Sequence, residues 1–470
     1  MKAIVALGMT MFLTAETIGQ ERQDISPEAA ATARTLMETA LESDLAYDIV
    51  ESLTTEIGPR LAGSEAEERA RAWGAALGQE LGFDRVEVEG FTMPFWDRDS
   101  LSITMTAPYE MELHGTALGG SGAGSVQSEI VYFRTVDDLV AAEDGSLEGR
   151  IAFIDGDIMV RSQVGAGYGP ANQRRRIGWQ HAERAGASAL VVRSVGSDSH
   201  RFPHTGMMSD LDGSWADIPV IAVSNPDADH LRRLHNNGEA ISLTVNSVAG
   251  WHGEVTSGNV VLDIVGRENP EEIVLIGGHL DSWDLGTGAV DDGAGVAITV
   301  AAAKLIADLP QRPRRTIRVV MFGAEEVGLL GARAYAEQHA DEVANHVLAT
   351  ESDFGARTIW RLSSNVSDAG TPVIDEVGRV IAPLGIIRGG SNEPGGGPDI
   401  IPLAMQGVPT VRLEQNGEDY FDLHHTPDDT LDKIDPDELA QNVAAYAALV
   451  YLAAETDVDF RETPDETASQ

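Results

Sequence analysis

Residues 273–283 read IVLIGGHLDSW, an apolar run that ends in two glycines, a histidine and an aspartate. The run Ile273–Ile276 is typical of a buried strand. His279 follows its carboxyl end, where open α/β sheets bind ligands. Asp281 lies on the same side of an extended chain, so we expect its side chain to accept the second ring N–H of His279. The stretch predicts a functional histidine at the edge of a sheet.

Two later apolar strands also end in carboxylates. Arg318–Phe322 leads into Glu325-Glu326, and Val347–Thr350 leads into Glu351-Ser352-Asp353. Past Trp251 such strands alternate with helices, which favours an α/β fold whose mixed, mainly parallel central sheet has helices on both faces. The carboxylates are therefore expected at the same edge of the sheet as His279.

Asp291 and Asp292 open an alanine- and valine-rich helix that ends near Leu309. Carboxylates there can simply cap the helix, but capping needs one of them and does not explain the nearby glycines. Likewise, Glu325-Glu326 taken alone is typical of a solvated pair at a helix start. At the end of a buried strand, however, the repulsion between adjacent carboxylates is costly unless a cation offsets their charge.

A loop near the C-terminus adds His424-His425-Thr426 before a final helix over about 436–454. Three strand ends and this loop hold the donors of a two-metal site, whose ions would lie roughly 3.5 to 4 Å apart and share one carboxylate. The chain has no cysteine, so histidines and carboxylates are the available ligands. They suit zinc, although cobalt or manganese can occupy the same donors.

The charge balance excludes some partners. With 75 acidic and 33 basic residues the formal net charge is −42, which disfavours nucleic acid and anionic membrane surfaces. The apolar run Ala3–Leu13 behind Lys2 is too short to span a membrane and predicts a signal peptide over residues 1–20. We expect a periplasmic or secreted protein; the alternative is an amphipathic start to the first helix.

The remaining chain divides into segments that differ in their predicted helices and strands. Residues 21–99 read mainly as helices, and 251–456 carry the strand–helix alternation. Between them, 100–250 contain short β-rich runs with one amphipathic helix near 178–185, which predicts an inserted β-rich domain. An acidic tail over 457–470 is expected to fray.

At these motifs the sequence resembles the co-catalytic zinc exopeptidases of the aminopeptidase and glutamate carboxypeptidase type, closest to their carboxypeptidase Q branch. The resemblance spans nearly the whole mature chain and makes the insertion look like a protease-associated domain. The matching segments are Gly58–Ser64, Arg193–Val195, Pro203–Gly206, Gly277–Asp284, Ala324–Glu326, Glu351–Asp353 and His424-His425.

The resemblance implies two Zn²⁺ ions per chain. Asp291 would bridge them, Glu326 and His425 would complete one coordination sphere, and His279 and Asp353 the other. The general base would be Glu325, and the Asp291–Asp292 peptide bond would be cis. His424 is expected to be a pocket or packing residue.

The implied activity is hydrolysis of short unblocked peptides, above all dipeptides, by a water that bridges two metals, with association as a homodimer. One alternative is an aminopeptidase acting on longer peptides with the same metals. Another is a non-catalytic, receptor-like binding module, although such proteins typically lose ligands. The glycine-rich segment 389–399 is interpreted equally as a surface loop or a substrate contact, which leaves the choice of peptide terminus open. His204 and Arg193 of the insertion are expected to be structural; the alternative is that they overhang the cleft and contact a peptide carboxylate.

Overall fold

The computed structural model of the protein describes residues 25–208, 215–393 and 395–461. The expected signal peptide lies outside these ranges, as do residues 462–470 of the expected tail. No helix within them combines the length and apolar character that crossing a membrane requires. Val458 and Phe460 are buried, so packing continues past the expected start of the tail.

One mixed sheet runs through the described residues. Its strands are β1 (Arg85–Ala107), β2 (Met111–Glu112), β3 (Gly115–Ala117), β4 (Gly124–Phe133), β5 (Ile151–Ile154), β6 (Ala189–Arg193), β7 (Val220–Val223), β8 (Ser242–Ile264), β9 (Asn269–His279), β10 (Arg315–Phe322), β11 (His346–Glu351), β12 (Ile359–Asn365), β13 (Ile387–Ser391) and β14 (Thr410–Gln415). They follow the order β13-β12-β14-β11-β9-β10-β8-β4-β5-β6-β7-β3, with β1 paired to β8.

In the body of the molecule the neighbours β10, β9, β11 and β14 are parallel. Strands β8 and β12 run antiparallel to β10 and β14. This is the mixed, mainly parallel α/β sheet that the alternation of strands and helices predicts, and it aligns the carboxyl ends of β9, β10 and β11.

The helices are α1 (Pro27–Leu41), α2 (Leu45–Ser52), α3 (Glu65–Glu80), α4 (Val136–Val140), α5 (Tyr168–Arg176), α6 (Gly178–Arg184), α7 (Asn225–Asn236), α8 (Ala294–Ala307), α9 (Leu330–Gln338), α10 (Thr371–Ile381), α11 (Ile401–Ala404), α12 (Tyr420–Leu423) and α13 (Pro436–Glu455). Short 3-10 or π turns are η1 (Leu53–Ile57), η2 (Ala289–Gly293), η3 (Ala340–Asn345), η4 (Ala382–Leu384) and η5 (Leu431–Lys433).

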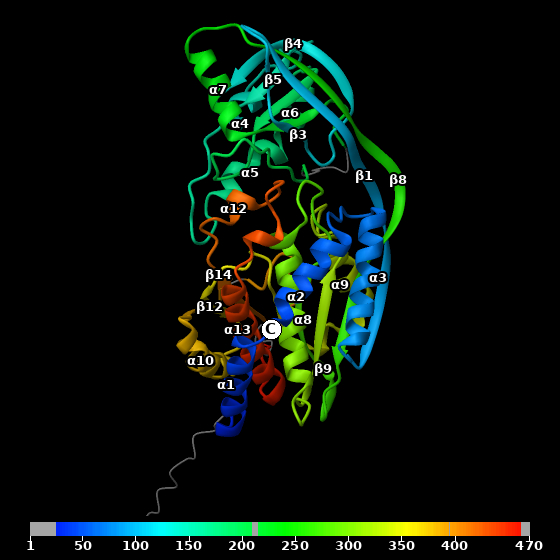
Figure 1. Cartoon of the computed structure of the whole chain (residues 1–470), viewed down its shortest axis with the longest axis vertical. Coiled ribbons are helices and arrows are strands. Elements are labelled where there is room, and N and C mark those ends of the chain that lie inside the picture. The colour runs from blue at the N-terminus through cyan, green and yellow to red at the C-terminus, as the bar shows by residue number, and fades with distance from the viewer. Residues whose placement is uncertain (1–24, 209–214, 394, 462–470) are drawn as a thin grey trace, which may run out of the picture.

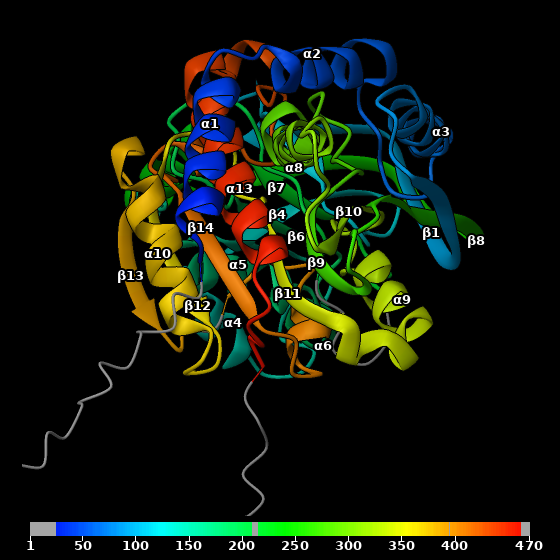
Figure 2. The same ribbon diagram turned by 90° about the horizontal axis from the view of Figure 1, so that it is seen from below.

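Helices cover both faces of the body sheet (Figure 2). Alternate residues of β9 point to opposite faces, as a strand requires. Val274 and Ile276 join the core under α1, α8 and α13, whereas Ile273 and Leu275 pack with α9 and α11. The continuous apolar run of β9 is thus explained by burial on two sides.

The inserted residues form a lobe above the body (Figure 1). Strands β4 to β7 are parallel neighbours, and α4 to α7 surround them. The lobe is therefore α/β, and the expectation of a β-rich insertion with one helix missed most of its helices. Strands β1 and β8, each 23 residues long, pair antiparallel and run from the body into the lobe.

Arg60 ties the N-terminal helices to the loops beyond β9. This side chain is fully buried in the turn between η1 and α3. It donates hydrogen bonds to the carbonyl oxygens of Leu280 (2.5 Å), Thr287 (2.6 Å) and Gly288 (2.8 Å). One guanidinium therefore fixes the loop that follows His279.

We predict that Arg60→Leu lowers the free energy of unfolding by about 3 kcal/mol or more, since each buried acceptor left without a donor costs roughly 1 to 3 kcal/mol. Urea denaturation of the purified variant measures this. Arg69→Leu, on the exposed side of α3, is the control and is expected to change stability by less than about 0.5 kcal/mol. Equal stability of the two variants would contradict the prediction.

Candidate active site

The structure brings the predicted site residues together from separate elements. His279 ends β9, Asp291 lies in η2, and Glu326 follows β10. Asp353 follows β11, and His425 follows α12. Their convergence follows from the parallel strands, which place successive carboxyl ends at one edge of the sheet.

Asp291 lies between the two histidines. Its Oδ1 is 3.0 Å from His279 Nε2, and its Oδ2 is 3.4 Å from His425 Nε2. Asp353 Oδ1 lies 3.7 Å from His279 Nε2, and Glu326 Oε2 lies 2.9 Å from His425 Nε2. The two oxygens of one carboxylate thus face two histidines, an arrangement that would allow Asp291 to bridge two ions.

These donors fit a cation. Within the described part of the chain, Asp291 Oδ2 and Glu326 Oε1 are buried without a hydrogen-bond partner, an arrangement that is costly unless something positive binds there. Three overlapping sets have donor atoms within 4.8 Å of one another, namely His279/Asp291/Glu326, His279/Asp292/Asp353 and Asp291/His424/His425. Imidazole and carboxylate donors in this number suit zinc.

The pKa shifts of the buried glutamates and of His279 also indicate a site that needs positive charge. Burial raises the pKa of Glu325 and Glu326 well above the usual value for glutamate. At His279 burial opposes protonation, but hydrogen bonds to Asp291 and Asp353 prevail and raise its pKa well above the ordinary range. In the metal-free chain a proton on His279 supplies positive charge among these carboxylates, and a bound metal cation would take the place of that proton.

Asp281 has a different partner from the one expected. His279 Nδ1 donates to the main-chain oxygen of Asp281 at 2.9 Å, whereas the Asp281 carboxylate is 3.8 Å from that nitrogen. The carboxylate instead accepts the main-chain N–H groups of Glu325 (3.0 Å) and Glu326 (3.3 Å). Asp281 thus supports the glutamates with its side chain and His279 with its backbone.

The backbone at the site is tightly packed. A Cβ at residue 278 would lie 2.7 Å from Asp292 Oδ2, so only glycine fits beside that carboxylate. The Asp291–Asp292 peptide bond is cis, as the resemblance implied. Ala324 and His425 have φ of 56° and 62°, the left-handed region that is uncommon for residues other than glycine.

His424 is buried against the same site. Its ring stacks on that of His425 with centroids 3.5 Å apart, and its Nε2 is 3.7 Å from Asp291 Oδ2. His425 lies closer to Asp291, at 3.4 Å, and also lies 2.9 Å from Glu326, which favours His425 as the ligand.

Asp429 is a residue that the sequence analysis missed. Its carboxylate accepts the main-chain N–H groups of Val290 (2.6 Å) and Asp291 (3.2 Å). Asp429 therefore holds the backbone of Asp291. The only signal was its position in the acidic turn after His425, which resembles any surface turn.

Arg193 and Asp399, the last residue of the glycine-rich segment, are both buried. Arg193 is fully buried in an ion pair with Asp155 at 2.7 Å, which confirms a structural role. In the glycine-rich segment 389–399, Asp399 is buried and its N–H donates to Glu351 Oε2 at 2.8 Å. That end of the segment is anchored beneath the site, so the interpretation as a surface loop is wrong there.

A cleft of about 690 Å³ opens over the candidate metal-binding donors. Its floor includes Asp291, Glu325 and His425, and its roof comes from the inserted lobe. The roof residues are Tyr168, Asn172, Arg175, Arg176, Met207, Met208 and Trp215. The lobe and the body thus share one cavity of the size that small-molecule sites commonly have.

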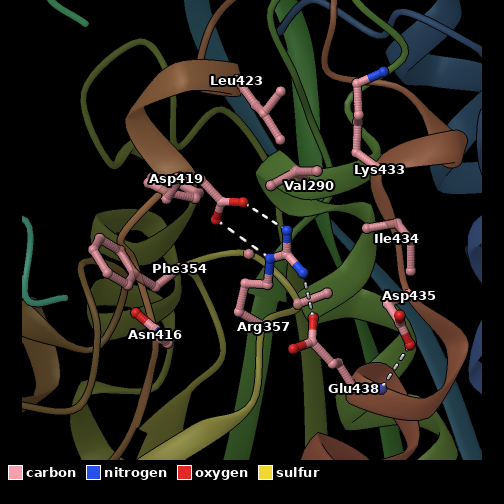
Figure 3. A pocket seen from close by; sticks show the side chains of 13 residues that line it. Val290, Phe354, Arg357, Asn416, Asp419, Leu423, Lys433, Ile434, Asp435 and Glu438 are labelled. Carbon is pink, nitrogen blue, oxygen red and sulfur yellow. Dashed lines mark hydrogen bonds and ion pairs between the residues drawn. The ribbon is translucent and has the colours of Figure 1, made fainter. Parts of the chain in front are cut away.

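A second hollow, lined in part by Val290 and Tyr420, is too small for a substrate (Figure 3). Its volume is about 20 Å³, room for roughly one water molecule. Arg357 lies there between Asp419 (2.6 Å) and Glu438 (2.8 Å). These ion pairs join the turn before α12 to α13 and so brace the segment that leads to His425.

Comparisons with known proteins agree with this geometry. The model of peptidase family M28 matches residues 259–450. Carboxypeptidase Q of Mus musculus is 34% identical over 413 residues, which cover 87% of this chain and 86% of the mouse protein.

Solved structures share the fold. The crystal structure of the peptidase M28 precursor from Shewanella amazonensis SB2B has a TM-score of 0.90 and 47% identity, over 93% of this chain and 99% of that one. The zinc aminopeptidase BSAP from Bacillus subtilis has a TM-score of 0.63 at 22% identity, over 88% of this chain and 97% of that one. On this evidence the chain is a metallopeptidase and belongs to peptidase family M28.

Proposed function

We propose that the protein is a zinc-dependent exopeptidase that holds two Zn²⁺ ions per chain and hydrolyses short unblocked peptides, above all dipeptides. The observation that carries the proposal is Asp291, whose two oxygens face His279 and His425 at 3.0 and 3.4 Å. In this assignment Glu326 completes the site of His425, and Asp353 completes the site of His279.

Glu325 is the proposed general base. It lines the cleft beside Asp291 and Asp353, and its main chain is held by Asp281. When bound, the ions supply Lewis acidity and lower the pKa of an attacking water. Glu325 would take the proton of that water and return it to the leaving amine.

The lining of the cleft supports peptides with a free carboxylate. Apart from the predicted metal ligands and Glu325, the charged residues that line it in the described chain are all arginines: Arg175, Arg176, Arg333 and Arg412. This is notable in a chain with a net charge of −42. Arginine binds carboxylates through charge-assisted hydrogen bonds, and the roof of the inserted lobe favours short substrates.

Export to the periplasm or the medium belongs to the same proposal, because Lys2 and the apolar run Ala3–Leu13 have the charge and length of a signal peptide. We also propose that residues 100–250 are a protease-associated domain. Association as a homodimer stays a prediction of the resemblance.

The first test combines chelation with Glu325→Gln. We expect that removing metal abolishes dipeptide hydrolysis and that zinc restores it. The variant is expected to keep two zinc ions per chain and to lose at least about 100-fold in kcat, the usual contribution of general acid–base catalysis. Metal analysis and steady-state kinetics measure both.

The control is Glu337→Gln on the exposed side of α9, which should behave as the wild type. An unchanged kcat in Glu325→Gln would contradict the assignment of Glu325 as the general base. Zinc binding without hydrolysis of any peptide by the wild type would favour the binding-module alternative.

Asp281→Asn tests the support of the glutamates. The amide of asparagine places an N–H group against the main-chain donors of Glu325 or Glu326, so we expect kcat/KM to fall roughly 10- to 100-fold, as for other residues that orient a metal site. Asp308→Asn, exposed at the end of α8, is the control. Equal kinetics for both variants would show that this hydrogen bonding is dispensable.

Terminal blocking tests the substrate. Amidation of the C-terminus of a dipeptide is expected to lower kcat/KM by about 10- to 100-fold, because a lost charge-assisted hydrogen bond costs roughly 1.5 to 3 kcal/mol. Equal rates for free and amidated dipeptides, together with hydrolysis of longer peptides, would instead identify an aminopeptidase. N-acetylated dipeptides complete the comparison.

A further inference from the structure

Part of the inserted lobe reaches the metal centre itself. The N–H of Thr205 donates to the main-chain oxygen of His425 at 3.0 Å, and His425 Nδ1 donates to the main-chain oxygen of Thr205 at 3.1 Å. The second bond leaves Nε2 facing Glu326 and Asp291. The lobe therefore selects the ring orientation of the proposed ligand His425.

His204 adds a second connection from the same segment. The side chain is fully buried, and its Nδ1 lies 2.8 Å from the main-chain oxygen of His424. Its Nε2 is 2.5 Å from Asp198 Oδ2, and Asp198 Oδ1 accepts the N–H of His200 at 2.6 Å. The carbonyl oxygen can only accept, so the ring donates to it from Nδ1.

The lobe also holds the start of this C-terminal segment. The N–H of Ser197 donates to the main-chain oxygen of Phe421 at 3.0 Å, and its hydroxyl donates to Asp422 Oδ1 at 2.7 Å. Arg161 forms an ion pair with the same Asp422 carboxylate. Residues 421–425 are therefore bound to the lobe at both ends.

His425 needs such support because its backbone has a φ of 62°. A non-glycine residue persists in this region only where its surroundings over-determine it. Gly206 contributes by its lack of a side chain, since a Cβ there would lie 2.9 Å from His425 Nδ1 and 2.0 Å from Arg175 Nη1.

We infer that His204 is a positioning residue for the metal centre. By holding the main chain of His424, it sets the ring of His425 for metal binding, so that the inserted lobe and the metal site form one cooperative unit. The inference rests on the proposed two-zinc site. It concerns metal retention and is therefore separable from the identity of the substrate.

The test compares three full-length variants that are first checked for folding by circular dichroism. His204→Leu removes the donor, His204→Asn keeps a donor near the position of Nδ1, and His346→Leu removes a fully buried histidine of the body that contacts Tyr335. Zinc content and zinc dissociation constants are measured by competition with a chelator.

We expect His204→Leu to weaken one of the two zinc sites roughly 10- to 100-fold. His204→Asn should restore most of this loss, and His346→Leu should leave zinc affinity unchanged. Wild-type zinc affinity in folded His204→Leu would overturn the inference, as would equal losses in His204→Leu and His346→Leu.

If His204→Leu does not fold, hydrogen–deuterium exchange of the wild type tests the inference instead. Adding zinc to the metal-free chain is expected to slow amide exchange in residues 197–206, and unchanged exchange would overturn the inference. A wild type that binds no zinc would overturn the proposed function and this inference together. If zinc slows amide exchange in residues 197–206 but the protein hydrolyses no peptide, only the proposed function is overturned.

Discussion

The repulsion among buried carboxylates is the constraint on which the site depends. Asp291, Glu325, Glu326 and Asp353 converge at one edge of the sheet, and such a group is stable only with positive charge among them. The surrounding structure supplies main-chain N–H groups through which Asp281 and Asp429 fix these residues. The buried Arg60 guanidinium fixes the adjoining loops. The body of the protein is thus a rigid frame for a local concentration of negative charge.

Much of this could be predicted from the sequence because the signals are local. The apolar strand before His279 and the strands that end in Glu325 and Asp353 predict both the parallel sheet and the meeting of these residues at its edge. Helix α7 was missed because it has many polar residues in a segment dominated by short strands.

Other features could not be predicted because they depend on contacts between distant segments. The Asp281 side chain was expected to contact the His279 ring two residues away, yet it binds main-chain groups 44 and 45 residues further on. From the sequence alone Asp429 is a turn residue. Only the fold brings its carboxylate to the main-chain N–H of Asp291. Asp399 is likewise buried beside Glu351, to which its main-chain N–H donates. Sequence patterns report on neighbours along the chain, whereas these roles arise from tertiary packing.

The bond between Thr205 and His425 joins residues 220 positions apart, and this separation bears on how the enzyme is made. A ribosome delivers His279, Asp291, Glu326 and Asp353 well before His425. During that interval the nascent chain carries an acidic group of donors without its final histidine. The inserted lobe, by contrast, is already complete when His425 emerges. A contact between residues so far apart carries a large cost in chain entropy, so the bond between the lobe and His425 is expected to form late in folding.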